Sequence, residues 1–333
     1  MEPLRIGVLG AAQIAPSAIA VPARLTGARL VAVAARDRAR AEAFAAANHV
    51  ERVLDTYADV VTDPEVDAIY NPLPNGLHGP WNLAALEAGK HVLSEKPFAS
   101  NQREATVVRD AAARAGLVAA EGLHWRYHPL AERILDLVGS DELGELTSVD
   151  ATMHIPAPPL DDHRWSLALA GGALMDLGCY ALHAHRVLAP FAGGEPRLVR
   201  AEGREHPGAP GVDEWCEAEL AFPSGATGTA RCRMAGQGVE MTLRVTGSEG
   251  EVVAPSFIAA QRDDRLLVRG NGGDRVEHLG TRPSFAYQLE AFTAAVRDGA
   301  ELPTDADDAV RNMALIDDCY RAIGLAPRPR SRI

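Results

Sequence analysis

Short apolar runs alternate with helix-like segments over the first third of the chain. The runs are typical of buried strands and occupy residues 4–9, 29–35, 67–71, 91–94 and 117–120. Segments rich in alanine and charged residues lie between them, at residues 38–47, 78–88 and 102–115. Strands that alternate with helices at this spacing predict a parallel, doubly wound sheet. We therefore expect an α/β domain over residues 1–121.

The hydrophobic pattern changes in the remaining chain. Strand-like stretches recur with turn glycines between several of them, at residues 146–155, 198–205, 214–222, 226–234, 240–246, 251–253 and 265–268. Helical patterns occupy residues 129–138, 173–188, 285–297 and 305–323. Strands that follow one another without long crossovers predict a large, open, mostly antiparallel sheet. Residues 122–333 are expected to form an α+β domain.

Composition and charge exclude several classes of function. The chain has 333 residues, 47% of them hydrophobic, and a formal net charge of -12. An acidic chain is poorly suited to nucleic acids or anionic membranes, which attract basic patches. The one basic run, from Arg328 to Arg332, is expected to be a frayed terminus.

Cysteine spacing and the start of the chain indicate a cytoplasmic protein. The cysteines Cys179, Cys216, Cys232 and Cys319 show no C-x-x-C spacing, which argues against a disulfide framework or a structural zinc site. Residues 1–5 do not resemble a signal peptide. No apolar run is expected to reach membrane-spanning length.

A candidate nucleotide turn follows the first strand. The dinucleotide fingerprint places small residues at three points, for the tight turn, for approach to the pyrophosphate and for helix packing. Here they are Gly10, Ala12 and Ala15, and Ala11, Gln13 and Ile14 complete the turn. Two of the three glycines of the fingerprint are replaced, so these residues alone also fit an ordinary strand–helix turn.

The end of the second strand bears on the choice of cofactor. An acid there favours NAD through the ribose 2′-hydroxyl, and an arginine favours NADP through the 2′-phosphate. Arg36 comes first, with Arg38 and Arg40 close behind, and Asp37 is suited to cap the next helix. NADP is the favoured cofactor and NAD the alternative.

Lys96 occupies the end of a central strand, where open α/β sheets bind ligands. It stands between Glu95 and Pro97, and a cis bond before Pro97 is expected to aim it. A lysine at this place suggests proton chemistry beside a dinucleotide; the alternative is a solvated loop lysine.

A wider set of motifs resembles the glucose–fructose oxidoreductase and inositol dehydrogenase family. The resemblance covers nearly the whole chain, in order, at residues 10–15, 71–75 with His78, 88–92, 95–97, 125–129, 164–165 and 171–180. Within the family, residues 31–37 look like the dimeric dihydrodiol dehydrogenase branch, which uses NADP, and the whole chain resembles most the dihydrodiol dehydrogenase and xylose dehydrogenase-like branch. Tyr180 stands where inositol-dehydrogenase-like members carry a histidine, which makes inositol a less suitable substrate.

The resemblance implies a Rossmann domain followed by an α/β domain whose open sheet often forms a subunit interface. It also implies hydride transfer between a nicotinamide and a secondary alcohol or ketone of a sugar, cyclitol or diol. We therefore expect a small polyhydroxy substrate and a homodimer or homotetramer.

One face of the predicted helix 173–188 carries the candidate catalytic groups. Asp176, Tyr180 and His183 are spaced at i, i+4 and i+7. Tyr180 is the expected acid/base, and a positively charged Lys96 would stabilise its phenolate or the developing alkoxide. Lys96 carrying the proton itself is the alternative. Asp176 is expected to bind a neighbouring substrate hydroxyl, and His183 to be structural.

Further residues are assigned to the cofactor site. Glu95 is expected to bond the nicotinamide ribose, and His78 either to do the same or to cap its helix. Trp125 is expected to border the nicotinamide, and the loop with Arg164 and Trp165 to act as a lid, with loop packing as the alternative. The remaining assigned residues are Pro72, Leu73, Asn75 and Arg126.

Two other functions compete with an oxidoreductase. A non-catalytic NAD(P)-binding sensor would share the fold but would not need Lys96, Tyr180 and Asp176. A metal enzyme is disfavoured because His124, His128, His154 and His163 lack ligand-like spacing.

Overall fold

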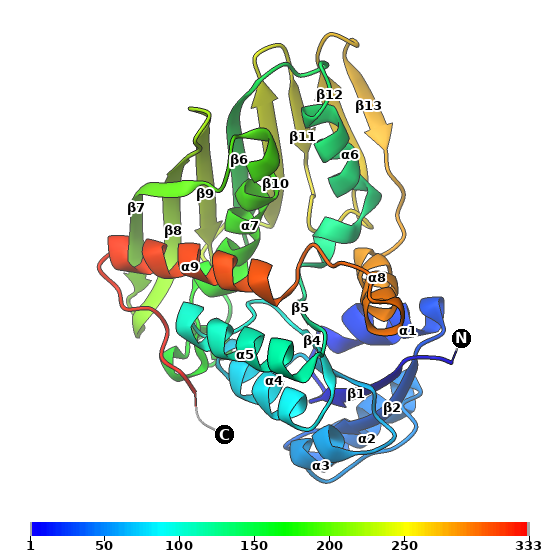
Figure 1. The fold of residues 1–333 in the computed structure, drawn as a ribbon. Helices are drawn as coiled ribbons and strands as arrows, with labels where there is room; N and C mark the ends of the chain where they lie inside the picture. The colour runs from blue at the N-terminus through cyan, green and yellow to red at the C-terminus, as the bar shows by residue number, and fades with distance from the viewer. Residues whose placement is uncertain (1, 332–333) are drawn as a thin grey trace. The chain divides into compact units, whose positions relative to one another are not determined.

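The structure is a computed structural model that describes residues 2–331, and it divides into two compact units (Figure 1). The first unit holds the chain up to His124, Phe285–Arg311 and the end of the chain from Arg330. The second holds Trp125–Ser284 and Asn312–Pro329. The return of residues 285–311 to the first unit is not predicted by the sequence, which has no signal for which sheet a late helix will cover.

The sheet of the first unit has five parallel strands in the order β2-β1-β3-β4-β5. Their bounds are Arg5–Leu9 (β1), Arg29–Ala34 (β2), Ala68–Asn71 (β3), His91–Ser94 (β4) and Ala119–Glu121 (β5). This is the doubly wound arrangement predicted from the alternating pattern. The crossovers put β1, β3 and β4 side by side, so the loops that follow them emerge at one edge.

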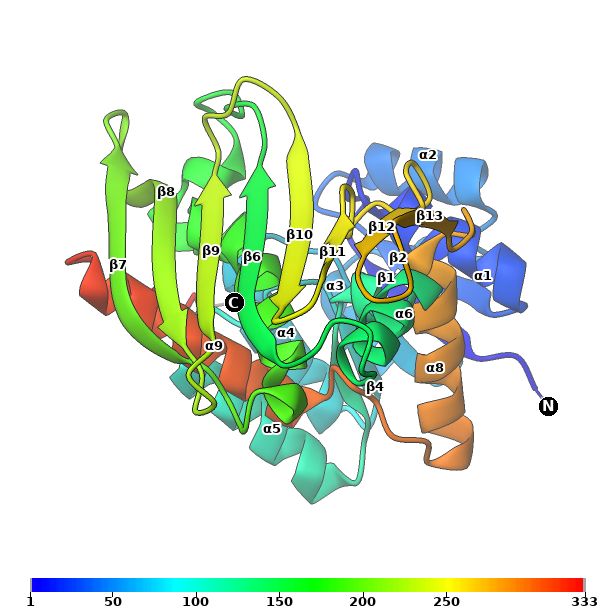
Figure 2. The same cartoon turned by 90° about the horizontal axis from the view of Figure 1, so that it is seen from above.

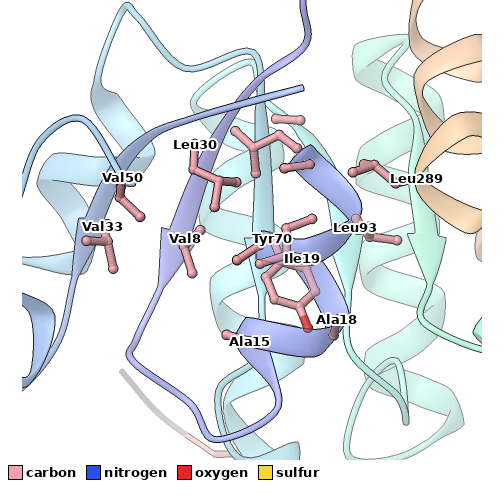
Figure 3. Close-up of a cluster of buried hydrophobic side chains, with 14 of the residues drawn as sticks. Val8, Ala15, Ala18, Ile19, Leu30, Val33, Val50, Tyr70, Leu93 and Leu289 are labelled. Atoms are coloured by element: carbon pink, nitrogen blue, oxygen red, sulfur yellow. The ribbon is translucent and has the colours of Figure 1, made fainter. Parts of the chain in front are cut away.

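Helices of the first unit bury the apolar strands. They are Val21–Thr26 (α1), Arg38–Asn48 (α2), Tyr57–Thr62 (α3), His78–Glu87 (α4), Gln102–Ala115 (α5) and Ser284–Asp298 (α8), with a π-helical turn Pro16–Ala20 (η1) and a 3-10 turn Asn75–Leu77 (η2). Val8, Tyr70 and Leu93 of the sheet meet Ile19 of η1 and Leu289 of α8 in one buried cluster (Figure 3).

The sheet of the second unit has eight strands in the order β13-β12-β11-β10-β6-β9-β8-β7 (Figure 2). Their bounds are Leu146–His154 (β6), Arg197–His206 (β7), Ala209–Ala221 (β8), Thr227–Arg233 (β9), Glu240–Gly247 (β10), Glu251–Ala254 (β11), Arg265–Arg269 (β12) and Arg275–His278 (β13). All neighbours are antiparallel except β6 and β9. The mostly antiparallel sheet is confirmed, although β13 has no apolar run and was not predicted.

Helices cover one face of this second sheet. They are Pro129–Val138 (α6), Cys179–Val187 (α7) and Ala306–Ala322 (α9, whose later turns belong to this unit), with shorter turns His124–Tyr127 (η3), His163–Trp165 (η4), Leu167–Leu169 (η5), Leu174–Gly178 (η6) and Ala189–Phe191 (η7). In β6, Val149, Ala151 and Met153 are buried while Asp150 and Thr152 between them are half-buried. α7 packs against β6 and β9, so the alternation marks the covered face.

The helix predicted over residues 173–188 differs in two respects. Its first part, η6, is a π-helix, and α7 starts only at Cys179. In the described part of the chain, Leu167–Phe191 is also long and apolar enough to cross a membrane by composition, with a mean hydropathy of 1.3 in its best window. The expectation that no apolar run approaches that length is wrong. However, 78% of that window is buried inside the protein, as in a core helix.

The basic run near the C-terminus is not frayed at its first residue, Arg328, and its last residue, Arg332, lies outside the described residues. Arg328 is 1% exposed, and its guanidinium pairs with the buried carboxylate of Asp213 at 2.5 Å. The expectation of a frayed terminus is therefore wrong for Arg328, because an arginine 115 positions from its partner gives no local signal of burial. The four cysteines are buried thiols, and burial raises the pKa of the Cys319 thiol to about 12.

Candidate functional site

The turn after β1 has the geometry that a dinucleotide turn needs. Gly10 adopts φ +90°, a conformation that favours glycine, and its N–H donates to the carbonyl of Ala34 at 2.7 Å. A Cβ on Gly10 would lie 3.1 Å from Cδ2 of Leu73, so the turn closes on the loop after β3. Ala15 is fully buried in the core cluster (Figure 3), whereas Gln13 and Ile14 are exposed.

The end of β2 separates the two charged groups that bear on cofactor choice. Asp37 caps α2, accepting hydrogen bonds from the N–H groups of Ala39 and Arg40. Arg38 pairs with Glu42, and Arg40 donates to the carbonyl of Ala11 at 3.0 Å.

Arg36 is exposed, and within residues 2–331 it makes no hydrogen bond or ion pair. The carboxylate at this strand end is therefore occupied, while one guanidinium is available to a ligand.

Asparagines order the loop after β3. The side chain of Asn71 donates to Asn82 Oδ1 at 2.8 Å and to the carbonyl of His78, and its oxygen accepts from the N–H of Leu73. Asn75 is 8% exposed at the start of η2. The sequence placed Pro72, Leu73 and Asn75 at the cofactor, and all three lie in this ordered loop.

His78 is used differently from either expectation. Its ring is 1% exposed, with Nδ1 2.6 Å from the carbonyl oxygen of Pro97 and Nε2 2.6 Å from that of Leu73. It does not cap α4, whose N-cap position is Leu77 and has no side-chain capping bond. The ring links the loop after β3 to the loop after β4 through both of its nitrogens, which leaves the predicted bond to a ribose without a ring nitrogen to make it.

The loop after β4 carries Lys96, which is half-buried. The Lys96-Pro97 peptide bond is cis, as predicted. Glu95 is 6% exposed and accepts the phenolic O–H of Tyr70 at 2.9 Å through Oε1. Within the first unit, the loops of Gly10, Leu73 and Lys96 thus meet at the carboxyl edge of the sheet, although each comes from a different strand.

Trp125 and Arg126 belong to the second unit. Trp125 is 2% exposed and packs edge-to-face on Phe257 and His183, with ring centroids 5.2 and 5.6 Å apart. Arg126 pairs with Glu132 of α6. These contacts give both side chains packing roles inside the unit, and their contact with a nicotinamide stays a prediction.

The candidate catalytic helix is buried. Asp176 lies in η6 and is 8% exposed, Tyr180 lies in α7 and is 6% exposed, and His183 is 1% exposed. Asp176 lies in the π-helical segment and Tyr180 in the α-helix that follows it. The prediction assumed α-helical spacing for both residues, which does not hold through η6.

Arg164 has a partner that the sequence did not predict. Its Nε donates to Oδ2 of Asp176 at 3.0 Å, and its NH1 contacts Asp162 at 3.2 Å. Attraction to Asp176, opposed by burial, raises the pKa of Arg164. The guanidinium thus holds a negative charge on Asp176.

The loop of Arg164 and Trp165 is bonded to the start of this helix, and its role as a lid stays a prediction. Gly172 donates its N–H to the carbonyl of Arg164 at 3.0 Å, and a Cβ on Gly171 would lie 2.3 Å from that oxygen. Trp165 donates from Nε1 to the carbonyl of Pro158, and its ring lies 4.2 Å from that of His206.

Asp213 supports η6 from behind and was missed by sequence analysis. Its Oδ2 accepts the N–H of Leu174 at 2.6 Å, and its Oδ1 accepts the O–H of Tyr320 at 2.8 Å and Arg328. Gly172, at φ +132°, leaves the space for it, since a Cβ there would lie 1.9 Å from Oδ1. A buried acid inside a strand was the available signal.

Metal chemistry has no donor set in the described chain. No group of three or more histidine, cysteine, aspartate or glutamate side chains among residues 2–331 is arranged to hold an ion. The polar groups that gather at the sheet edge and on η6 are suited to hydrogen bonding and proton transfer.

The parallel sheet with its glycine turn defines a dinucleotide-binding protein. Two family models match the chain: an oxidoreductase family with an NAD-binding Rossmann fold over residues 4–123, and the GFO/IDH/MocA C-terminal domain over residues 132–253. The chain belongs to the Gfo/Idh/MocA oxidoreductase family, as the motifs indicated. The prediction of an NAD(P)-dependent oxidoreductase is thereby confirmed.

Relatives of known activity support the predicted branch. D-xylose 1-dehydrogenase (NADP(+)) 2 of Haloferax volcanii is 34% identical, covering 96% of this chain and 97% of its own. Trans-1,2-dihydrobenzene-1,2-diol dehydrogenase of Bos taurus is 33% identical over 67% of this chain and 64% of its own. Among solved structures, a 3-ketoreductase from Actinomadura kijaniata with NADP and TDP-benzene has a TM-score of 0.88 and 27% identity, covering 96% of this chain and 98% of its own.

Proposed function

We propose that this protein is an NADP-dependent dehydrogenase or reductase that interconverts an alcohol and a carbonyl group of a sugar, a cyclitol or a related diol. The observation that carries the proposal is the shared edge of the first sheet, where the glycine turn, the ordered Asn71–His78 loop and the Lys96 loop meet. Gly10 supports a bound dinucleotide because a side chain there would close the turn against Leu73. When bound, the cofactor accepts or supplies the hydride.

The proposed preference for NADP rests on Arg36. Its guanidinium suits a 2′-phosphate, which offers oxygens for paired hydrogen bonds. Asp37, the residue that would favour a ribose 2′-hydroxyl, is engaged at the helix cap. Several relatives point the same way, since the xylose dehydrogenase and the ketoreductase are named with NADP.

Lys96 and Tyr180 are the proposed proton-transfer pair. As the alcohol is oxidised, its carbon gives up the hydride and its hydroxyl proton passes to Tyr180 or to Lys96; reduction reverses both. Structures of the Actinomadura ketoreductase include variants in which one lysine or one tyrosine is replaced. Those two positions are separated by the same number of residues as Lys96 and Tyr180, which supports the pair.

Asp176 is proposed to bind a hydroxyl next to the reacting carbon. Its pairing with Arg164 favours the ionised carboxylate, which accepts hydrogen bonds from alcohols strongly. Glu95 is proposed to bond the ribose of the nicotinamide from its buried position beside Lys96. The remaining proposed cofactor contacts are Gly10, Ala11, Ala12, Gln13, Ile14, Pro72, Leu73, Asn75, Trp125, Arg126, Arg164 and Trp165; His78 is not among them, since both of its ring nitrogens face carbonyl oxygens.

The test measures NADPH formation or consumption with a panel of aldoses, ketoses, cyclitols and diols. Lys96→Ala and Tyr180→Phe are each expected to lower kcat by about 10²–10⁴-fold while leaving NADP binding in place. Lys90→Ala, at a lysine before β4, is the matched control and should keep turnover. Tight NADP binding with no turnover on any substrate would instead favour a sensor.

We also propose a cytoplasmic homodimer or homotetramer formed through the second sheet. Four buried cysteine thiols fit a reducing compartment. The face of β6 that carries Asp150 and Thr152, opposite the buried Val149 and Ala151, is the proposed contact surface. Light scattering of the purified protein tests the assembly, and a monomer at micromolar concentration would contradict it.

A further inference from the structure

The loop that carries Lys96 is held by three buried carboxylates. The N–H of Lys96 donates to Oε2 of Glu95 at 3.3 Å, and the N–H of Phe98 donates to Oε1 of Glu121 at 2.9 Å. The N–H of Ser100 donates to Oε2 of Glu104 at 2.8 Å. Glu95, Glu104 and Glu121 are each at most 6% exposed. Every second backbone N–H group from residue 96 to residue 100 therefore donates to a buried carboxyl group.

The carbonyl groups of the same loop are fixed by side chains of α4. Asn82 donates from Nδ2 to the carbonyl of Phe98 at 3.2 Å. His78 faces the carbonyl of Pro97 with Nδ1 and that of Leu73 with Nε2, both at 2.6 Å. His78 therefore connects the lysine loop to the loop that closes on Gly10.

The chemistry of these two contacts constrains the ring. A carbonyl oxygen only accepts hydrogen bonds, and a neutral imidazole has a single N–H to donate. If His78 were neutral, one ring nitrogen would turn its lone pair toward a carbonyl oxygen at 2.6 Å. An imidazolium donates to both oxygens, and charge-assisted bonds are short.

The charges around the ring favour this form. The titratable side chains on the neighbouring elements are Tyr70 of β3, Glu95 and Lys96 of the loop, Glu104 of α5, Glu121 at the end of β5, and Arg330, which pairs with Glu104 at 3.3 Å. Glu104 lies against the first turn of α4, because a Cβ on Gly79 would be 2.3 Å from its Cδ. Three carboxyl groups stand against two cations, Lys96 and Arg330, so the region still suits one further positive charge.

We propose that His78 is a positioning residue for Lys96, held as a buried imidazolium that fastens the lysine loop to the loop after β3. The positioning role rests on the proposed function of Lys96, whereas the charged state of the ring does not. An imidazolium here fixes the carbonyl next to the lysine and so restricts where the ammonium group can reach.

Other histidines supply internal references. The Nδ1 atoms of His91 and His128 accept backbone N–H groups, from Val118 at 3.0 Å and Leu130 at 3.1 Å. Burial lowers the pKa of both imidazoles, so each ring is neutral and its Nδ1 is the unprotonated nitrogen. His185 also faces two carbonyl oxygens, at the longer distances of 2.8 and 3.0 Å, and burial lowers the pKa of its imidazole, so it serves as the reference for a ring with the same pair of contacts.

The charge is tested by ¹⁵N NMR of histidine-labelled protein at pH 7.5, with the His78→Gln spectrum assigning the signal. His78 is expected to show two protonated ring nitrogens, whereas His91 and His128 show one protonated and one bare nitrogen. A bare-nitrogen signal from His78 would overturn the charged state whatever the enzyme does.

Positioning is tested by kinetics. His78→Phe, which has no donor, is expected to lower kcat by up to about 100-fold, and His78→Gln, which keeps one donor, by less. The affinity for NADP should change far less than kcat, and His91→Gln in the same unit should keep wild-type kcat. Unchanged kcat in a folded His78→Phe protein, while Lys96→Ala is inactive, would overturn positioning but leave the proposed function standing; full activity of Lys96→Ala would remove the proposed function itself.

Discussion

Arg164 reaches Asp176 through Nε at 3.0 Å, and the two residues are held together by backbone contacts as well as by charge. The carbonyl of Arg164 accepts the N–H of Gly172, two residues before η6 begins. The loop and the helix start therefore form one structural piece. Any change at Arg164 should act on Asp176 before it acts on anything else.

Replacing Arg164 by Gln should raise the substrate KM and lower kcat, because Asp176 loses the guanidinium that orients it. The free energy of unfolding should fall by about 2 kcal/mol, the scale of a lost charged hydrogen bond. Arg186→Gln is the control, since Arg186 of α7 makes a similar pair with Glu195 that this change breaks. Equal kinetic losses in both variants would show that Arg164 has no special relation to Asp176.

Replacing Arg36 by Ala should weaken NADP binding by about 10- to 100-fold and leave NAD binding nearly unchanged, because a phosphate contact is worth about 1.5–3 kcal/mol. Fluorescence titration with both cofactors measures the change. Arg24→Ala, at another exposed arginine of the first unit, should leave both affinities as they are. A parallel loss for NAD and NADP would place Arg36 outside the 2′-phosphate site.

Replacing Arg328 by Met should destabilise the protein by about 3–5 kcal/mol, since it leaves the Asp213 carboxylate buried without its cation. Urea unfolding measures this loss, and Asp213→Asn in the same chain should recover part of it. Arg321 is itself exposed, pairing with the exposed Asp318 at 2.8 Å and more distantly with the buried Asp317 at 3.8 Å, so Arg321→Ala should cost at most about 1 kcal/mol. If Arg328→Met and the wild type were equally stable, Arg328 would not be paired with Asp213 in solution.

Glu277 should make stability depend on acid pH. Hydrogen bonding from Arg133, opposed by partial burial and helped by Arg275, lowers the pKa of Glu277 to about 2. Because the folded pKa lies below the unfolded value near 4.5, the contribution is complete above pH ~4.5 and is lost as pH falls toward 2. Wild type should exceed Glu277→Gln by on the order of 2 kcal/mol at pH 6, and the two should converge near pH 2. A constant difference across that window would contradict this assignment.

Gly172→Ala should unfold the start of η6 or shift it, because the new Cβ would lie 1.9 Å from Asp213 at φ +132°. Strain of this kind costs at least about 1–3 kcal/mol. Gly238→Ala is the matched control, since no heavy atom lies within 4 Å of its Cβ position. Thermal unfolding of the two variants compares the sites directly.

Local patterns were enough to predict most elements. The helices Gln102–Ala115 and Pro129–Val138 and the strand His91–Ser94 have the predicted bounds, because caps and glycines mark their ends. The edge strand β13 was missed since its residues, Arg275–His278, alternate charged side chains with a single valine. An edge strand needs little apolar surface, and so leaves little pattern.

The site was predictable where chemistry lies at strand ends and not where it depends on distant partners. Gly10, Lys96 and the cap at Asp37 follow from position along the chain. The pairing of Arg164 with Asp176, the bridge made by His78 and the burial of Arg328 depend on which loops the tertiary fold brings together. Glu121 and Asn71 are polar residues at the ends of buried strands. The sequence could place them at the edge of the sheet, but it could not show which groups they would bond.

The first unit is completed late in synthesis. Phe285, Leu289 and Phe292 of α8 belong to its core cluster, yet they follow the whole second sheet in the chain (Figure 3 labels Leu289). When only the first 124 residues have left the ribosome, the apolar surface that α8 will cover is exposed to water. Covering it needs about 160 further residues, on the order of 10–30 seconds of translation. A nascent chain of this design has reason to engage a chaperone during that interval, and a fragment cut at residue 124 should aggregate.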